Sequence, residues 1–264
     1  MLVSIIVPAY KQEKTIQQDI ENIYNVMSQT RWDFEIIVVA DGLADKTFEN
    51  VLKLKYKNVK VVGYQTNKGK GYAIRYGMAR ADGEFVVFID SGMDINANGI
   101  SLVLEHMQWY NADIIVASKR HLASKVTMPL IRKLYSFGYH IIVKLLFGLS
   151  VKDTQTGLKV FKRKVLEDVL PRLLVKEFAF DIELLAVSHH LGYKRIFEAP
   201  VEINLDIDSS TFKKFLFLEP YIRRVLWDTL AVFYRLRILR YYDTGNKRKW
   251  IYDKELEMRV NTGQ

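Results

Sequence analysis

The first 118 residues alternate short apolar runs with segments of helical period, and this feature limits the possible folds most. Runs such as "FEIIVV" and "EFVVFI" are continuously apolar, which is typical of parallel strands buried on both faces. Strands are predicted at residues 2–7, 34–39, 59–64, 85–90 and 113–117, and helices near 13–28, 45–54, 68–80 and 97–109. This alternation indicates βαβ units, so we expect an α/β fold with a mostly parallel sheet flanked by helices.

The pattern changes in the second half of the chain, where longer helical segments precede one strand near 194–203 and a helical tail. We expect a domain over 1–211, divided into halves 1–118 and 119–211, and an amphipathic, basic and aromatic helical tail over 212–264. No apolar segment reaches the roughly 20 residues that a spanning helix needs, so no transmembrane segment is expected. The N-terminal run is interpreted as a first strand rather than a signal peptide.

The net charge of +9 belongs to the second half of the chain. Residues 1–118 hold 12 Lys and Arg against 14 Asp and Glu, residues 119–164 hold 11 against one, and residues 212–250 hold 10 against 3. This asymmetry suggests an anionic partner, either a membrane or a nucleic acid. The absence of cysteine excludes disulfides and thiolate ligands, and it fits a cytoplasmic protein.

Carboxylates directly follow two of the predicted strands. Asp41 ends "FEIIVVAD", and Asp90 ends "EFVVFID" with Asp94 four residues later. Ligands of open α/β sheets bind beyond such strand ends. Asp90 and Asp94 are therefore predicted to be ligands of Mg²⁺ or Mn²⁺, which favour a few carboxylates together with substrate phosphates. The alternative for Asp94 is that it caps the following helix.

Two further stretches follow strand ends. Pro8 and Tyr10 come after the first strand, where proline ends the ladder and leaves backbone groups for a ligand. The turn "NKGKG", which contains Lys70, opens a helix and could cradle phosphates through its backbone amides. A tight turn with solvated lysines is the alternative interpretation of this turn.

The motifs "VPAY", "VVADG", "NKGKGYAIRYGMARADGEFVVFIDSGMD", "DTQTGLKVF" and "FAFDIELL" occur in this order. The chain resembles the family 2 glycosyltransferases with a GT-A fold, and among them the polyprenyl-phosphate (dolichyl-phosphate) glucosyl- and mannosyltransferases, over about residues 2–205. The resemblance implies an enzyme that moves a hexose from a nucleotide sugar to a polyprenyl phosphate with Mg²⁺ or Mn²⁺. It favours UDP-glucose as the donor and leaves GDP-mannose as the other choice.

The resemblance also implies residue roles. The nucleotide would be bound by Pro8, Tyr10, Glu13, Asp41, Lys70 and Asp90, and the metal by Asp90 and Asp94. The acceptor phosphate would lie near a loop, "DTQTGLKVF", and near Ser118, Lys119, Arg120, Thr156, Lys159 and Lys213. The implied catalytic residues are Asp90, Asp94, Lys159 and Asp181.

Three positions depart from the family pattern. Ala40 precedes Asp41 where the family usually has a second acid, and Gly92 occupies the third position of the usual Asp-x-Asp motif. The segment "DIDSSTFKK" lacks the usual arginine, for which Lys213 would substitute.

The acceptor decides which groups the reaction needs. A phosphate monoester has a second pKa near 6, so it is largely dianionic at pH 7 and needs no general base. Its direct attack would invert the anomeric configuration. A saccharide hydroxyl, the first alternative acceptor, would need a base, for which Asp181 and Glu183 are candidates, although Asp181 could equally cap a helix. The second alternative is a catalytically silent nucleotide-sugar-binding or membrane-scaffold protein.

Two segments fit a membrane surface. Residues 132–149 place Lys133, Ser136, His140 and Lys144 on one stripe of an otherwise apolar helix. The tail "YIRRVLWDTLAVFYRLRILRYYD" mixes aromatic residues with five arginines, as interfacial segments do. We therefore expect a peripheral protein on the cytoplasmic face of a membrane, with a buried helix and a dimer contact as alternatives. Nucleic acid is not expected, because the strand-end carboxylates would repel its phosphates.

Overall fold

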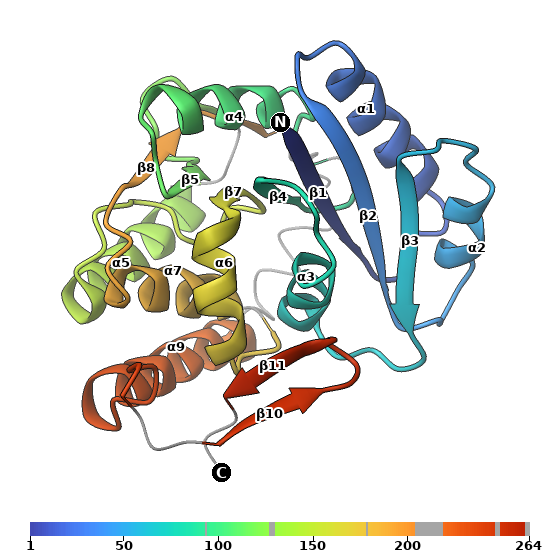
Figure 1. The fold of residues 1–264 in the computed structure, drawn as a ribbon. Helices are drawn as coiled ribbons and strands as arrows, with labels where there is room; N and C mark the ends of the chain where they lie inside the picture. Colours follow the sequence, from blue (N-terminus) through green and yellow to red (C-terminus); the bar gives the residue numbers. More distant parts are fainter. Residues whose placement is uncertain (93, 127–129, 178, 204–218, 246–248, 262–264) are drawn as a thin grey trace.

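A seven-stranded sheet forms the centre of the computed structural model, which describes residues 1–92, 94–126, 130–177, 179–203, 219–245 and 249–261 (Figure 1). The strand order is β3-β2-β1-β4-β7-β5-β8. The strands are β1 (Leu2–Ala9), β2 (Asp33–Asp41), β3 (Val59–Tyr64), β4 (Phe85–Ile89), β5 (Ile114–Ala117), β7 (Leu158–Lys162) and β8 (Ile196–Ala199). All five strands predicted in the first 118 residues are present, so the predicted α/β fold is confirmed.

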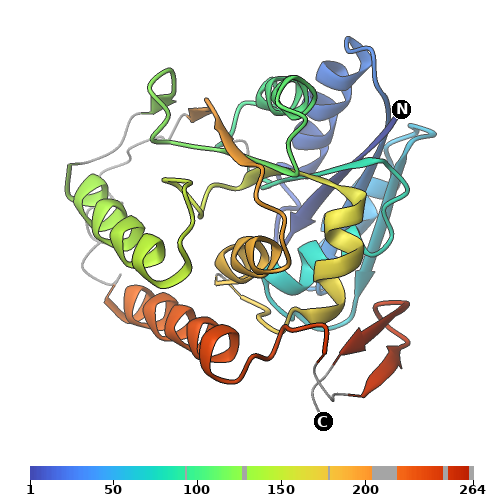
Figure 2. The same ribbon diagram turned by 60° about the vertical axis from the view of Figure 1, so that its left-hand side comes forward.

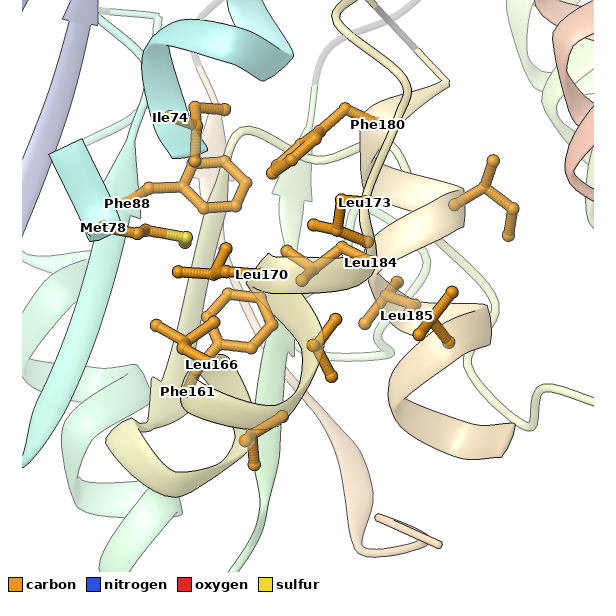
Figure 3. Packing of buried hydrophobic residues seen from close by; sticks show 14 of the residues in the cluster. Ile74, Met78, Phe88, Phe161, Leu166, Leu170, Leu173, Phe180, Leu184 and Leu185 are labelled. Atoms are coloured by element: carbon orange, nitrogen blue, oxygen red, sulfur yellow. The ribbon is translucent and has the colours of Figure 1, made fainter. Parts of the chain in front are cut away.

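Helices cover both faces of the sheet. One face carries α1 (Ile16–Ser28), α2 (Thr47–Leu52) and α4 (Gly99–Trp109), and the other carries α3 (Lys70–Met78), α6 (Arg163–Val169) and α7 (Phe180–His190). Alternation along β1 sends Ile5 and Val7 to the first face and Ile6 to the second. On the second face, Phe88 and Phe161 from the sheet meet leucines of α6 and α7 (Figure 3).

Strand β7 differs from the sequence-based expectation. It lies between β4 and β5 and is antiparallel to both, whereas the other strands of the large sheet pair in parallel. The first four residues of its sequence, "LKVFK", belong to the segment 153–161 that we expected to be a loop. The expectation was wrong for this part, because two lysines in five residues do not resemble a buried central strand.

Helices α5 (Leu130–Phe147) and α9 (Glu219–Phe233) lie side by side at one end of the molecule (Figure 2). Tyr139 Oη and Thr229 Oγ1 are 3.0 Å apart, and the Phe147 ring meets the Phe233 ring edge-on. A π-helical turn (Tyr234–Ile238) follows α9. Of the helices in the described ranges, none combines the length and the apolar character needed to cross a bilayer.

The tail was predicted to be wholly helical, and this is wrong for its last part. β10 (Trp250–Asp253) and β11 (Met258–Asn261) form an antiparallel hairpin, which Arg80 holds through the Glu257 carboxylate at 2.7 Å. Two short strands, β6 (Lys125–Val126) and β9 (Glu202–Ile203), form a separate parallel pair, and η1 (Leu170–Arg172) is a 3₁₀ turn after α6.

Candidate active site

The carboxyl ends of β1, β2 and β4 open into a cleft of about 1100 Å³. It is lined by most of the residues predicted to bind the nucleotide and the metal: Pro8, Tyr10, Asp41, Lys70, Asp90 and Asp94. Glu13 does not line it. Instead the Glu13 carboxylate accepts a hydrogen bond from the Lys46 amide at 3.2 Å, and the Glu13 amide donates to Asp45 at 3.1 Å.

Asp90 is the first residue after β4, and the neighbouring strand fixes its backbone. Its amide donates to the Gly157 carbonyl at 2.8 Å. Oδ2 accepts a hydrogen bond from Lys70 Nζ at 2.7 Å, whereas Oδ1 is buried without a hydrogen-bond partner in the described part of the chain. One oxygen of this cleft carboxylate is thus satisfied and the other is available to a cation.

Two further hydrogen bonds hold the turn after Asp90. Ser91 Oγ donates to the Pro8 carbonyl at 2.8 Å, and the Gly92 amide donates to Asp19 of α1 at 2.9 Å. Gly92 has a φ of +105°, a conformation that non-glycine residues rarely adopt. An aspartate at this position, the third of the Asp-x-Asp pattern, would therefore be strained in the present backbone conformation.

Gly157 provides the space that Asp90 occupies. A Cβ at residue 157 would lie 1.9 Å from Asp90 Oδ2 and 2.2 Å from its Cγ. Residue 157 immediately precedes β7, so its position is set by the pairing of Leu158 with Ile89. Glycine is therefore required for the Asp90 carboxylate to lie where it does.

Asp90 and Asp94 fit a metal that arrives with its substrate. Both line the cleft, and Asp90 Oδ1 is an orphaned buried acceptor. Within the described ranges there is no group of three or more His, Asp or Glu side chains that could hold a metal. Two carboxylates suffice for Mg²⁺ or Mn²⁺ where substrate phosphates complete the ligand shell. The residue set thus favours a cation shared with a diphosphate.

Asp41 organises the Gly-rich turn. Its Oδ1 accepts hydrogen bonds from Tyr64 Oη at 2.9 Å and the Lys68 amide at 2.7 Å, and its Oδ2 accepts from Asn67 Nδ2 at 2.9 Å and the Gly69 amide at 3.1 Å. A carboxylate offers about four lone-pair sites, so these bonds use its acceptor capacity. Contact of Asp41 with a base stays a prediction, while its contacts within the chain hold the turn that lines the cleft.

A second polar group lies where the acceptor phosphate was predicted. Lys119 Nζ lies 3.2 Å from both Thr156 Oγ1 and Asp153 Oδ2, and Lys119 and Thr156 line the cleft. Burial alone would raise the pKa of Asp153, but the Lys119 charge and the Thr156 hydroxyl lower it below its ordinary value. Gln155 Nε2 is a buried donor of the same loop without a hydrogen-bond partner among the described residues.

The surroundings of this group are positive. His140 and Lys152 also line the cleft, and burial together with the charges of Arg120 and Lys144 lowers the pKa of His140. The neighbouring charges of Arg120 and Lys144, unlike the burial, would favour an anion in the cleft.

Ser118 and Arg120, which were also predicted to bind the acceptor phosphate, do not line the cleft. Ser118 is buried and accepts a hydrogen bond from the Arg120 amide at 3.2 Å, and the Arg120 guanidinium lies 5.6 Å from the Phe137 ring centre. Lys213 lies outside the described residues.

Lys159 is not a cleft residue. It is 0% exposed, and its Nζ donates to Asp181 Oδ1 at 2.6 Å and to the Thr156 carbonyl at 2.5 Å. Burial lowers the pKa of Lys159, an effect that the Asp181 charge opposes. Asp181 is the second residue of α7, which begins at Phe180, so it is not the helix N-cap. This geometry does not support the prediction that Lys159 faces the acceptor phosphate.

Two helices of the second half also line the cleft. Helix α5 contributes Tyr139, Ile142 and Val143 beside the polar Ser136 and His140, and helix α9 contributes Val225 and Leu226. The cleft therefore joins the carboxylates at the strand ends to a wall made by the two helices in Figure 2.

The outer surface of the same helices exposes large apolar side chains. Leu145 is 79% exposed on α5, Trp227 is 74% exposed on α9, and Ile238 is 63% exposed in the turn that follows. Arg223 and Arg224 are exposed on α9 as well. Large side chains that share a surface with cations are typical of an interaction site.

Four residues of the site were not predicted: Asp19, Asn67, Gln155 and Gly157. Asp19 resembles any polar residue of an amphipathic helix, and nothing near it in the sequence connects it with residue 92. The others lie inside quoted motifs, "NKGKG" and "DTQTG", and their residue types hint at a tight turn or a polar loop. Only the fold shows that Asn67 meets Asp41 and that Gly157 meets Asp90.

Comparison with known proteins gives consistent results. The model of the family described as glycosyl transferase family 2 matches residues 4–170. A dolichyl-phosphate beta-glucosyltransferase of Trichomonas vaginalis is 32% identical over 249 residues, which cover 89% of this chain and 75% of that protein. One of Drosophila melanogaster is 30% identical over 204 residues, covering 71% and 63% respectively.

Solved structures resemble the fold at lower identity. Glucosyl-3-phosphoglycerate synthase of Mycobacterium tuberculosis, crystallised with Mn²⁺, UDP-glucose and phosphoglyceric acid, superposes with a TM-score of 0.65 at 18% identity, over 88% of this chain and 79% of that one. Mannosyl-3-phosphoglycerate synthase of Rubrobacter xylanophilus gives a TM-score of 0.66 at 14% identity, over 97% and 82%.

Proposed function

The chain belongs to glycosyl transferase family 2, and on that premise we propose that it transfers glucose from UDP-glucose to a polyprenyl (dolichyl) phosphate at a membrane surface. The observation that carries the proposal is the lining of the cleft. The carboxylates and lysines at the strand ends suit a nucleotide diphosphate with its cation, and the apolar side chains from α5 and α9 suit a lipid chain. The relatives named as dolichyl-phosphate glucosyltransferases support glucose as the sugar.

At the donor end, Asp90 and Asp94 would hold a divalent cation on the diphosphate. When bound, Mg²⁺ or Mn²⁺ would neutralise the charge that develops on the departing diphosphate. The residues of the chain orient the donor: Pro8 and Tyr10 border the nucleotide, and Lys70 adds a positive charge 2.7 Å from Asp90.

At the acceptor end, Lys119 would bind the polyprenyl phosphate. Asp153 and the Thr156 hydroxyl fix its ammonium group, and the orphaned donor Gln155 Nε2 supplies a further hydrogen bond. The phosphate is largely dianionic at pH 7, so one of its oxygens attacks the anomeric carbon as the bond to the diphosphate breaks. The attack inverts the configuration and gives a β-linked product. Catalysis then consists of positioning and charge stabilisation.

The exposed face of α5 and α9 would dock on the bilayer. Leu145, Trp227 and Ile238 would enter the interface, and Arg223 and Arg224 would lie at headgroup level. The negative surface potential of the cytoplasmic leaflet attracts such cations, which contribute about 1 kcal/mol each. The lipid acceptor would then reach the cleft between the same two helices.

A saccharide hydroxyl acceptor has less support. It needs a base at the cleft, and neither Asp181 nor Glu183 lines it. Asp181 is paired with Lys159, while Glu183 is fully buried and accepts hydrogen bonds from Tyr242 Oη at 2.6 Å and the Val175 amide at 2.8 Å. Both carboxylates are committed to contacts inside the fold.

A transfer assay tests the proposal. Purified protein, Mn²⁺ and labelled UDP-glucose or GDP-mannose are mixed with and without polyprenyl phosphate, and butanol-extractable label is counted. We expect lipid-linked glucose that is lost with EDTA and with Asp90→Ala, and retained with Asp33→Ala, since Asp33 has a carboxylate that is 85% exposed at the start of β2. Transfer only to a saccharide would favour the enzyme with a hydroxyl acceptor. Nucleotide binding without turnover would favour the catalytically silent protein.

Vesicle sedimentation tests the docking face. Trp227→Ser and Leu145→Ser are expected to reduce binding to vesicles of phosphatidylcholine and phosphatidylserine. Trp109→Ser is the matched control, because Trp109 is 73% exposed on α4, outside the α5–α9 pair. Equal losses for Trp227→Ser and Trp109→Ser would contradict the assigned surface.

A further inference from the structure

The buried Lys159–Asp181 pair lies directly beneath the proposed reaction site. Lys159 belongs to β7, opposite Phe88 on one side and Val116 on the other, near the middle of the large sheet. A cation in such a place costs several kcal/mol unless it is paired and hydrogen-bonded. Here Asp181 supplies the charge and the Thr156 carbonyl supplies a hydrogen bond, and the ammonium lies 5.0 Å from the centre of the Phe88 ring.

The Thr156 carbonyl is the point where this pair meets the cleft. The next residue, Gly157, accepts a hydrogen bond from the Asp90 amide at 2.8 Å and leaves room for the Asp90 carboxylate. The Thr156 hydroxyl accepts a hydrogen bond from Lys119 Nζ at 3.2 Å. One peptide thus lies between the carboxylate of the donor end and the ammonium group of the acceptor end.

We infer that Lys159 and Asp181 are positioning residues, which hold the Thr156–Gly157 peptide so that the donor and acceptor groups keep their separation. Lys159 acts through the Thr156 carbonyl and does not touch the acceptor phosphate. A misplacement of about 1 Å in such a site can cost roughly 100-fold in rate. The inference rests on the proposed function where it predicts kcat and KM. It does not rest on the proposed function where it predicts the hydrogen exchange of the Asp90 amide.

The test replaces the pair by apolar side chains. Lys159→Met alone leaves Asp181 buried without its cation and is expected to unfold at a lower temperature. The double substitution Lys159→Met with Asp181→Leu removes both charges and is expected to recover the melting temperature. In this folded double variant we expect kcat to fall about 100-fold, with KM for polyprenyl phosphate within threefold of the wild type.

Lys119→Met is the matched comparison, because Lys119 also contacts Thr156 but lines the cleft, whereas Lys159 does not. It is expected to raise KM for polyprenyl phosphate at least tenfold with a smaller change in kcat. If the double variant instead showed this pattern, Lys159 would contact the acceptor and the inference would be wrong. A double variant with wild-type kcat would reduce the pair to a stabilising role and also overturn it.

Amide hydrogen exchange gives a readout that does not depend on turnover. The Asp90 amide is protected by the Gly157 carbonyl, so its exchange is expected to speed up at least tenfold in the double variant. Unchanged exchange there would refute the positioning role. If the wild-type enzyme makes no lipid-linked sugar, the proposed function has failed, and this exchange rate still decides the role of Lys159.

Discussion

Replacing Gly157 by alanine should disable the site while leaving the fold intact. A Cβ at residue 157 would lie 1.9 Å from Asp90 Oδ2, and real Cβ contacts under 3.0 Å essentially do not occur, so this oxygen must retreat by about 1.1 Å. The retreat also pulls it away from Lys70, its partner at 2.7 Å. Displacement of a reacting group by about 1 Å costs roughly 100-fold in rate, or about 2.7 kcal/mol of transition-state stabilisation.

The assay is kcat/KM for transfer, measured beside the melting temperature. The Asp90 side chain is 33% exposed and can turn toward solvent, so Gly157→Ala should lower the melting temperature by only a few degrees. Gly245→Ala is the control, since a Cβ there meets nothing within 4 Å. If kcat/KM of Gly157→Ala stayed within threefold of the control, the contact between residue 157 and Asp90 would be irrelevant to the reaction.

Three further changes probe other parts of the site. Asp41→Asn replaces one of the two acceptor oxygens by an NH2 group, so either the Lys68 or the Gly69 amide loses its acceptor. The variant should be less stable by about 1–3 kcal/mol in denaturant unfolding and should bind UDP more weakly in calorimetry, and unchanged affinity would contradict this. Lys119→Met should raise the inhibition constant of inorganic phosphate against transfer, and an equal constant would remove Lys119 from the acceptor end. Burial raises the pKa of Glu183, so its contribution to stability is present below its ordinary pKa of 4.5 and is lost as pH rises through the folded pKa. Glu183→Gln stays neutral, so its melting temperature relative to wild type should increase with pH above 4.5, whereas a pH-independent difference would count against the raised pKa.

The parts of the fold that the sequence predicted are those with local signals. β2 and β4 are apolar runs, and each leads into an aspartate whose place at a strand end follows from the order of residues alone. Parallel strands bring their carboxyl ends to one edge, so the meeting of Asp41, Asp90 and Pro8 at one cleft followed from topology. The placement of these side chains at the site needed no long-range information.

The parts that the sequence did not predict depend on contacts far apart in the chain. The family resemblance implied that Lys159 faces the acceptor phosphate, but Lys159 is buried, and its partner 22 residues later, Asp181, makes that burial possible. The hairpin β10–β11 is tied to the turn before α3, where Lys68 meets Glu255 at 2.5 Å, a contact that spans 187 residues. No pattern within a short window could reveal either pairing.

Strand β7 explains how the two halves of the site keep their register. The residues that we propose to bind the donor precede residue 118, and the loop that we propose to bind the acceptor follows it. Strand β7 nevertheless pairs with β4, so both groups are attached to neighbouring strands of one sheet. Side chains of a strand alternate between the two faces, so a slip by one residue would move Lys159 from Asp181 to the apolar cluster under α1 and α4 and would move Gly157 off Asp90. Burying an unpaired lysine there would cost several kcal/mol, so the Lys159–Asp181 pair favours the register in which Gly157 leaves room for Asp90.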